Sequence, residues 1–137
     1  MRAVRLILVA LTATAVVLLA TPASAKEGVR AKLDGTARID AAPGTKIRVA
    51  WRLVDAGGRP FGASGIYLRV ARCAGGVRRV PARNAGRGRF SARVVVPRGG
   101  IRELRVGLPG WRIPRGGKAQ RADRLFAFDP PLVRRCG

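Results

Sequence analysis

The amino-acid sequence predicts an all-β fold, an antiparallel β-sandwich of about seven short strands. Three observations support this prediction. Apolar and polar residues alternate over short runs, which is the period of a half-buried strand. Glycine and proline interrupt these runs at intervals of about 8–12 residues, as turns do. No stretch carries a sustained apolar stripe at helical spacing. A closed barrel is the alternative arrangement of the same strands.

The first 25 residues have the features of a secretory signal peptide. Arg2 and Arg5 precede an uncharged apolar run at 6–20, and residues 23–25 (Ala-Ser-Ala) match the small-residue pattern of a cleavage site. The apolar run is shorter than the roughly 20 residues of a spanning helix. An uncleaved membrane anchor is the alternative. We therefore expect one exported domain over residues 26–137, secreted or associated with the cell envelope.

Seven strands are expected within that domain, at 35–41, 46–54, 66–72, 77–80, 90–96, 101–108 and 124–130. Residues 26–33 are expected to be a loose lead, 82–88 a loop and 111–123 an irregular excursion. In the last strand, Leu125 and either Phe126 or Phe128 should face inward, whereas Tyr67 and Ala71 should face outward. The side chains expected in the core are Ile47, Val49, Trp51, Leu53, Ile66, Leu68, Val70, Phe90, Val94, Val96, Leu104, Val106 and Leu108.

Positive charge dominates the sequence. It contains 28 lysines and arginines against seven aspartates and glutamates, which gives a net charge of +21. The expected signal peptide holds two of these basic residues and no acid, so the exported domain keeps +19. Such a surface attracts polyanions.

A set of outward side chains on the expected strands forms the candidate polyanion-binding site: Arg48, Arg52, Arg69, Arg93, Arg105 and Tyr67. The partner would be an anionic cell-wall polymer, lipid headgroups or an envelope protein, and nucleic acid would bind only non-specifically. A second hypothesis is a cationic effector that acts on membranes, which an exposed apolar patch beside the arginines would favour. The simpler interpretation is that these arginines only solvate the polar face of a sheet.

Enzymatic chemistry is not expected. The sequence has no histidine, so it lacks Ser-His and Cys-His nucleophile pairs and imidazole metal ligands. Its acids are scattered in a positive field that disfavours a protonated general acid. The phosphate-loop pattern fails at Arg112 and Ala119. We therefore expect a protein without catalytic residues, metal or cofactor.

Two cysteines, Cys73 and Cys136, complete the sequence signals. An even number of cysteines in an exported protein indicates a disulfide. A metal-binding thiol pair is the alternative, although no histidine or further thiol is present to complete it.

Two stretches carry a resemblance to a known class of proteins: IRVAWRLVDAGGRPFGASGIYLRV at 47–70 and GRFSARVVVPRGGIRELRVGLPGW at 88–111. They resemble secreted or anchored actinobacterial proteins of the broad Ig-like class. More distantly, they are similar to the sandwiches appended to carboxypeptidases and to periplasmic copper carriers. The resemblance implies an Ig-like antiparallel sandwich and no biochemical activity. Copper carriage would need Met and His ligands, and the only methionine is Met1.

Overall fold

Ten strands and no helix make up residues 28–137, the part of the chain that the computed structural model describes. The all-β prediction is confirmed. The expected signal peptide at 1–25 lies outside the described residues. Within 28–137, no helix is long and apolar enough to cross a membrane. The strands are β1 (Arg30–Leu33), β2 (Lys46–Val54), β3 (Tyr67–Arg72), β4 (Val77–Pro81), β5 (Arg83–Gly86), β6 (Arg89–Val95), β7 (Ile101–Leu108), β8 (Trp111–Arg112), β9 (Gln120–Arg121) and β10 (Arg124–Val133).

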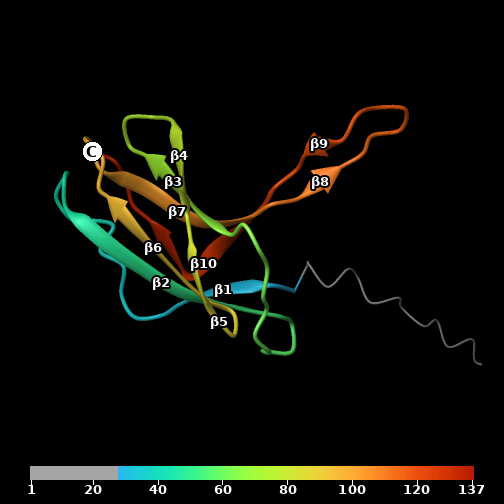
Figure 1. The fold of residues 1–137 in the computed structure, drawn as a ribbon. Helices are drawn as coiled ribbons and strands as arrows, with labels where there is room; N and C mark the ends of the chain where they lie inside the picture. The colour runs from blue at the N-terminus through green and yellow to red at the C-terminus, as the bar shows by residue number, and fades with distance from the viewer. Residues whose placement is uncertain (1–27) are drawn as a thin grey trace, which may run out of the picture.

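Eight of the strands form one sheet in the order β4-β3-β7-β10-β1-β2-β6-β5. This sheet curls like a barrel around the core, and the curl brings β4 close to β6 (Figure 1). All neighbouring strands are antiparallel except β1 and β10, which are parallel. The remaining strands, β8 and β9, form a separate hairpin between β7 and β10 that stands clear of the body. The curl therefore has a β1-β2-β6-β5 half and a β4-β3-β7-β10 half.

All thirteen side chains expected in the core are buried inside the curl. Trp51 lies at its centre and is fully buried, with its ring 6.1 Å from that of Phe90 and 5.8 Å from that of Phe128. Strand alternation explains this success, because every second residue of β2, β6 and β7 points to the same side of the sheet. Phe61, from the loop after β2, packs against the same core.

The N-terminal part of the prediction is wrong. Residues 35–41 form turns and bends rather than a strand, and the first strand is β1, in the segment expected to be a loose lead. Gly35 has a φ of 84°, which ends the extended chain directly after β1. Ala31 is fully buried, and β1 pairs with both β2 and β10. Four residues with two cations are too few to show alternation in the sequence.

The segments expected to be irregular also contain strands. Residues 83–86 form β5, the edge strand beside β6, and residues 111–123 contain the β8–β9 hairpin. In β10, Phe128 is buried as expected, but Leu125 is 40% exposed. Leu125 pairs with Gly107 and Phe126 with Val106, so Phe126 takes the inward side. Because apolar residues are adjacent here, the sequence alone does not define the register.

Tyr67 and Ala71 correct another expectation. Both lie on the side of β3 that points away from the core, yet they are only 5% and 0% exposed. The Tyr67 ring lies across Gly107 of β7, where a side chain would collide with it. Ala71 is a small side chain that lies between its strand partners Val77 and Glu103. Neighbouring side chains, rather than the core, cover these two residues.

The disulfide between Cys73 and Cys136 is confirmed, with an S–S distance of 2.02 Å. Cys73 follows β3 and donates a backbone hydrogen bond of 3.0 Å to the carbonyl of Gly100, just before β7. The bridge therefore fastens the end of the chain to the β3–β7 side of the sheet.

Candidate anion-binding face

The structure divides the six residues of the candidate polyanion-binding site between the two halves of the curl. Arg48 and Arg52 lie on β2 and Arg93 lies on β6, in the β1-β2-β6-β5 half. The other three belong to β3 and β7, in the opposite half. Within the sheet, β10 and β1 lie between the two groups, so each group is considered separately.

The outer side of the first half carries a group of basic side chains that we call the cation face. Strand pairing places these side chains in rows that run across the neighbouring strands. Arg48 lies opposite Arg93, whereas Arg52 lies between Lys32 of β1 and Arg89 of β6. The members of the cation face are Lys32, Lys46, Arg48, Arg52, Arg83, Arg89 and Arg93, and all of them are exposed.

No carboxylate neutralises the cation face. Within residues 28–137, each of the five ion pairs involves other arginines, and no member of this face has an acidic group within 4.0 Å. Like charges directly opposite one another on paired strands destabilise a sheet. Two unit charges 4 Å apart repel by about 1 kcal/mol even in bulk water. An anion that lies across the rows would relieve this repulsion.

A hollow of about 560 Å³ opens on the same face. Arg48, Arg93 and Arg83 of the edge strand line it, together with the polar side chains of Ser91 and Asn84 and with Pro81 of β4. Guanidinium groups match the geometry of phosphate and carboxylate oxygens, and the hydroxyl and amide add neutral donors. Among the described residues, no cluster of three or more histidine, cysteine or acidic side chains could hold a metal ion.

The two candidate arginines of the opposite half, by contrast, share one carboxylate within the protein. Arg105 contacts Glu103 at 2.7 Å, and Arg69 approaches the other oxygen of the same carboxylate at 3.9 Å. Glu103 is 17% exposed, so it is held between the two guanidinium groups. These two arginines are therefore less available to an external anion than those of the cation face.

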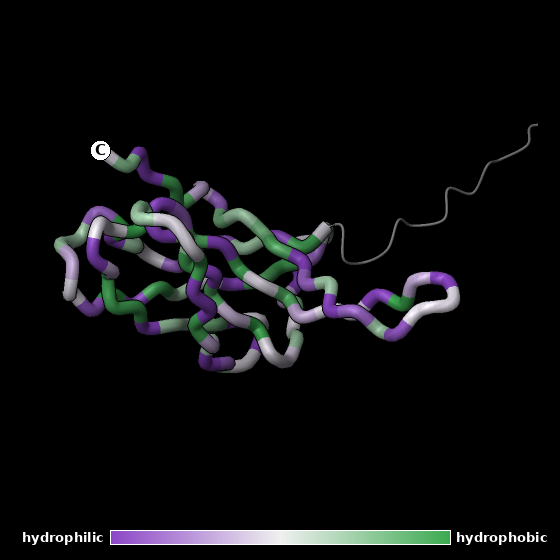
Figure 2. Tube along the Cα trace, turned by 90° about the horizontal axis from the view of Figure 1, so that it is seen from above, coloured by the Kyte–Doolittle hydropathy of each residue, from purple (hydrophilic) through white to green (hydrophobic). Residues whose placement is uncertain are grey.

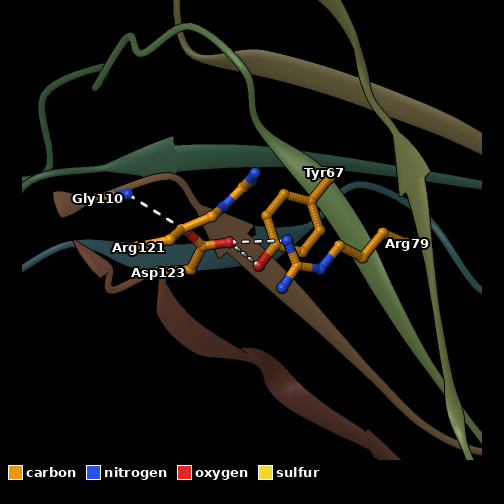
Figure 3. A network of polar contacts seen from close by, with 5 residues as sticks. All are labelled: Tyr67, Arg79, Gly110, Arg121 and Asp123. Carbon is orange, nitrogen blue, oxygen red and sulfur yellow. Dashed lines mark hydrogen bonds and ion pairs between the residues drawn. The ribbon is translucent and has the colours of Figure 1, made fainter. Parts of the chain in front are cut away.

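Tyr67, the sixth candidate, belongs to a polar network around Asp123 (Figure 3). Its hydroxyl donates a 2.7 Å hydrogen bond to Asp123, whose other donors are Arg121 Nε at 2.9 Å and the Gly110 amide at 3.4 Å. Arg79 lies 3.2 Å from the same carboxylate and stacks 5.0 Å above the Tyr67 ring. Figure 3 shows all these groups directed at Asp123, although they come from β3, β4 and both ends of the hairpin segment.

The network changes the acidity of its members. The hydrogen bond from Arg121, with that from Tyr67, lowers the pKa of Asp123 from 3.8 to about 2. Burial of the phenol, followed by its hydrogen bond to Asp123, raises the pKa of Tyr67. A carboxylate and a phenol held in these protonation states fix the architecture and are not poised for proton transfer at neutral pH.

Sequence reasoning missed four members of the cation face: Lys32, Lys46, Arg83 and Arg89. Lys32 and Arg83 lie in segments that were expected to be irregular, so no alternation was available to orient them. Lys46 begins the strand expected at 46–54, on the same face as Arg48, and Arg89 precedes the strand expected at 90–96 by one residue, so this signal was available. The sequence alone could therefore have added Lys46 and Arg89 to the candidate site, but not Lys32 and Arg83.

No protein-family model, curated protein sequence or solved structure matches this chain.

Proposed function

We propose that the protein is a non-enzymatic, secreted or envelope-associated module that binds an anionic polymer through the cation face. The observation that supports this most is the group of seven exposed cations on four neighbouring strands, with no acidic partner among residues 28–137. The other half supports the same choice of face, because there Glu103 and Asp123 each contact two arginines.

The proposed binding relies on charge density rather than on the identity of the polymer. Neighbouring strands lie about 4.8 Å apart, and outward residues along one strand repeat at about 7 Å. Polyphosphate or an acidic polysaccharide that crosses the rows would meet a cation at each strand and release counterions as it binds. DNA would bind through the same charges without sequence preference, because nothing in this arrangement reads base edges.

For the fold, we propose an Ig-like β-sandwich, as the resemblance of 47–70 and 88–111 implies. The two halves of the curl enclose one core, and the antiparallel pairings of β2 with β6 and of β3 with β7 lie in opposite halves. Both features fit a sandwich whose halves are joined through the parallel β1–β10 pair.

The test compares two triple variants that remove the same charge. Arg48, Arg52 and Arg93 are changed to Gln in one, and Arg98, Arg102 and Arg135, which are exposed outside the cation face, are changed in the other. Binding to long-chain inorganic polyphosphate is measured between about 50 and 200 mM salt, where such contacts weaken steeply. We expect the first variant to lose at least about tenfold more affinity and to lower the salt slope by about 2–3 more than the second.

A third variant changes Arg69 and Arg105, the ion-paired members of the original candidate set, to Gln. For each charge removed, it should lose less affinity for polyphosphate than the cation-face variant does. Equal losses in the two triple variants would show that binding depends only on total charge, and the cation face would then have no special role.

A further inference from the structure

The β8–β9 hairpin exposes the two most accessible large apolar side chains of residues 28–137. Trp111 is 71% exposed and Ile113 is 76% exposed. Trp111 lies on β8, and Ile113 follows the last residue of that strand, so the two side chains lie close together in the sequence on the same arm of the hairpin. Figures 1 and 2 both show the hairpin extending away from the body, so no other part of the fold covers these side chains.

Only positive charge accompanies this apolar pair. Residues 110–122 contain four cations, Arg112, Arg115, Lys118 and Arg121, and no acid. Arg115 and Lys118 flank the tip, where the Gly117 amide donates a 3.0 Å hydrogen bond to the Pro114 carbonyl and Gly116 has a φ of 69°. The hairpin therefore combines two exposed apolar side chains with a basic tip.

The base of the hairpin is fixed to the sheet. The Ala122 amide donates a 2.8 Å hydrogen bond to the Gly110 carbonyl, and Asp123 binds the Gly110 amide, Arg121 and Tyr67 of the body (Figure 3). A Cβ atom at Gly110 would lie 2.5 Å from the Ala122 carbonyl oxygen, so the two chains approach as closely as glycine allows. Because the base is fixed in this way, the hairpin extends from the sheet and the Trp111 side chain stays exposed to solvent.

We propose that the β8–β9 hairpin is a docking element for an anionic phospholipid surface, into which Trp111 and Ile113 insert. Tryptophan favours the membrane–water interface, where its ring is apolar and its N–H remains solvated. Arg112, Arg115 and Lys118 would contact headgroup phosphates, as basic clusters near a bilayer do, whereas Arg121 is already paired with Asp123. A second copy of the chain suits the hairpin less well, because it carries the same net charge of +21. The proposal uses none of the residues of the cation face and does not depend on that function.

The test separates apolar insertion from simple charge attraction. Vesicles of phosphatidylcholine alone, and vesicles mixed with phosphatidylglycerol, are titrated with the native protein and two double variants. Trp111→Ser with Ile113→Ser removes the apolar pair without changing the charge. Val77→Ser with Val133→Ser is the matched control, because those side chains are 46% and 60% exposed elsewhere. Burial of each inserted side chain contributes roughly a factor of ten in partitioning. We therefore expect the hairpin variant to bind mixed vesicles about 30–100-fold more weakly and the control to change by less than about twofold.

Tryptophan fluorescence provides the second measurement. Trp51 is fully buried, so a blue shift on adding mixed vesicles, and quenching by brominated acyl chains, report Trp111. We expect both signals in the native protein and neither in the hairpin variant. Equal vesicle affinity of the two double variants, or no quenching of the native protein, would overturn the proposal. Concentration-dependent dimers that Trp111→Ser with Ile113→Ser abolishes, without vesicle binding by the native protein, would also overturn it and indicate a second copy as the partner.

Discussion

Replacing Asp123 by Asn tests whether one carboxylate fixes the hairpin to the sheet. The change keeps the shape of the side chain but removes the charge that Arg121 and Arg79 contact at 2.9 and 3.2 Å. The Asp123 side chain is only 8% exposed, so water replaces these partners poorly. Asn can still accept a hydrogen bond, so the stability that the variant loses comes mainly from the missing negative charge.

The pKa of Asp123 gives the size of the effect. A drop from 3.8 to about 2 corresponds to about 2–3 kcal/mol of stability at neutral pH. Arg121 and Arg79 are 51% and 54% exposed, so solvent screens part of their attraction to the carboxylate. We therefore expect the Asp123→Asn variant to lose about 1–2 kcal/mol of its free energy of unfolding. A carboxylate with a lowered folded-state pKa contributes its stability fully above the unfolded pKa and loses it as the pH falls through the folded value. The difference between native protein and variant should therefore close between about pH 4 and pH 2.

Urea unfolding at pH 7 and at pH 2 measures this difference. The control is Asp40→Asn, which removes an exposed carboxylate that is in none of the ion pairs within 28–137, and it should change stability by less than about 0.5 kcal/mol. If the Asp123→Asn variant stays destabilised by the same amount at both pH values, the charge of Asp123 is not the cause and the reasoning fails.

Two further predictions concern the covalent bridge and the Tyr67 contact. Replacing Cys73 and Cys136 together by Ser should lower the free energy of unfolding by up to about 4 kcal/mol, since the bridge joins residues 63 apart in sequence; a loss under about 1 kcal/mol in denaturant titrations would contradict this. Gly107→Ala should cost about 2 kcal/mol or more, because the new methyl group collides with the Tyr67 ring. Its control, Gly62→Ala, meets no atom within 4 Å, and equal melting temperatures of the two variants would show that the ring moves aside freely.

Local alternation explains which parts of the fold the sequence predicted. In β2 and β6 alternate side chains point to opposite faces, and the apolar set marks the face that packs on the core. Trp51 and Phe90 could therefore be placed without knowing any strand partner. Tyr67 could not be placed, because it is covered by Asp123, a residue 56 positions away in the sequence. Burial that comes from a distant segment leaves no periodic signal nearby.

Strand order explains why the candidate site was predicted only in part. Each arginine of the original set does lie on the outer side of its strand. Whether Arg69 is a neighbour of Arg48 depends, however, on which strands pair, and pairing is a long-range property. Along the sheet, β7, β10 and β1 lie between their strands, so the two arginines belong to different halves of the curl.

The position of β10 has a consequence for how the chain reaches its native state. The last strand of the sequence lies in the middle of the sheet, hydrogen-bonded to β7 on one side and to β1 on the other. Until residues 124–133 are available, β1 and β7 both present unpaired backbone edges, which are sites of aggregation. A C-terminal truncation should therefore yield insoluble protein rather than a smaller domain. A chain that is synthesised from its N-terminus can complete this sheet only after residues 124–133 have been added.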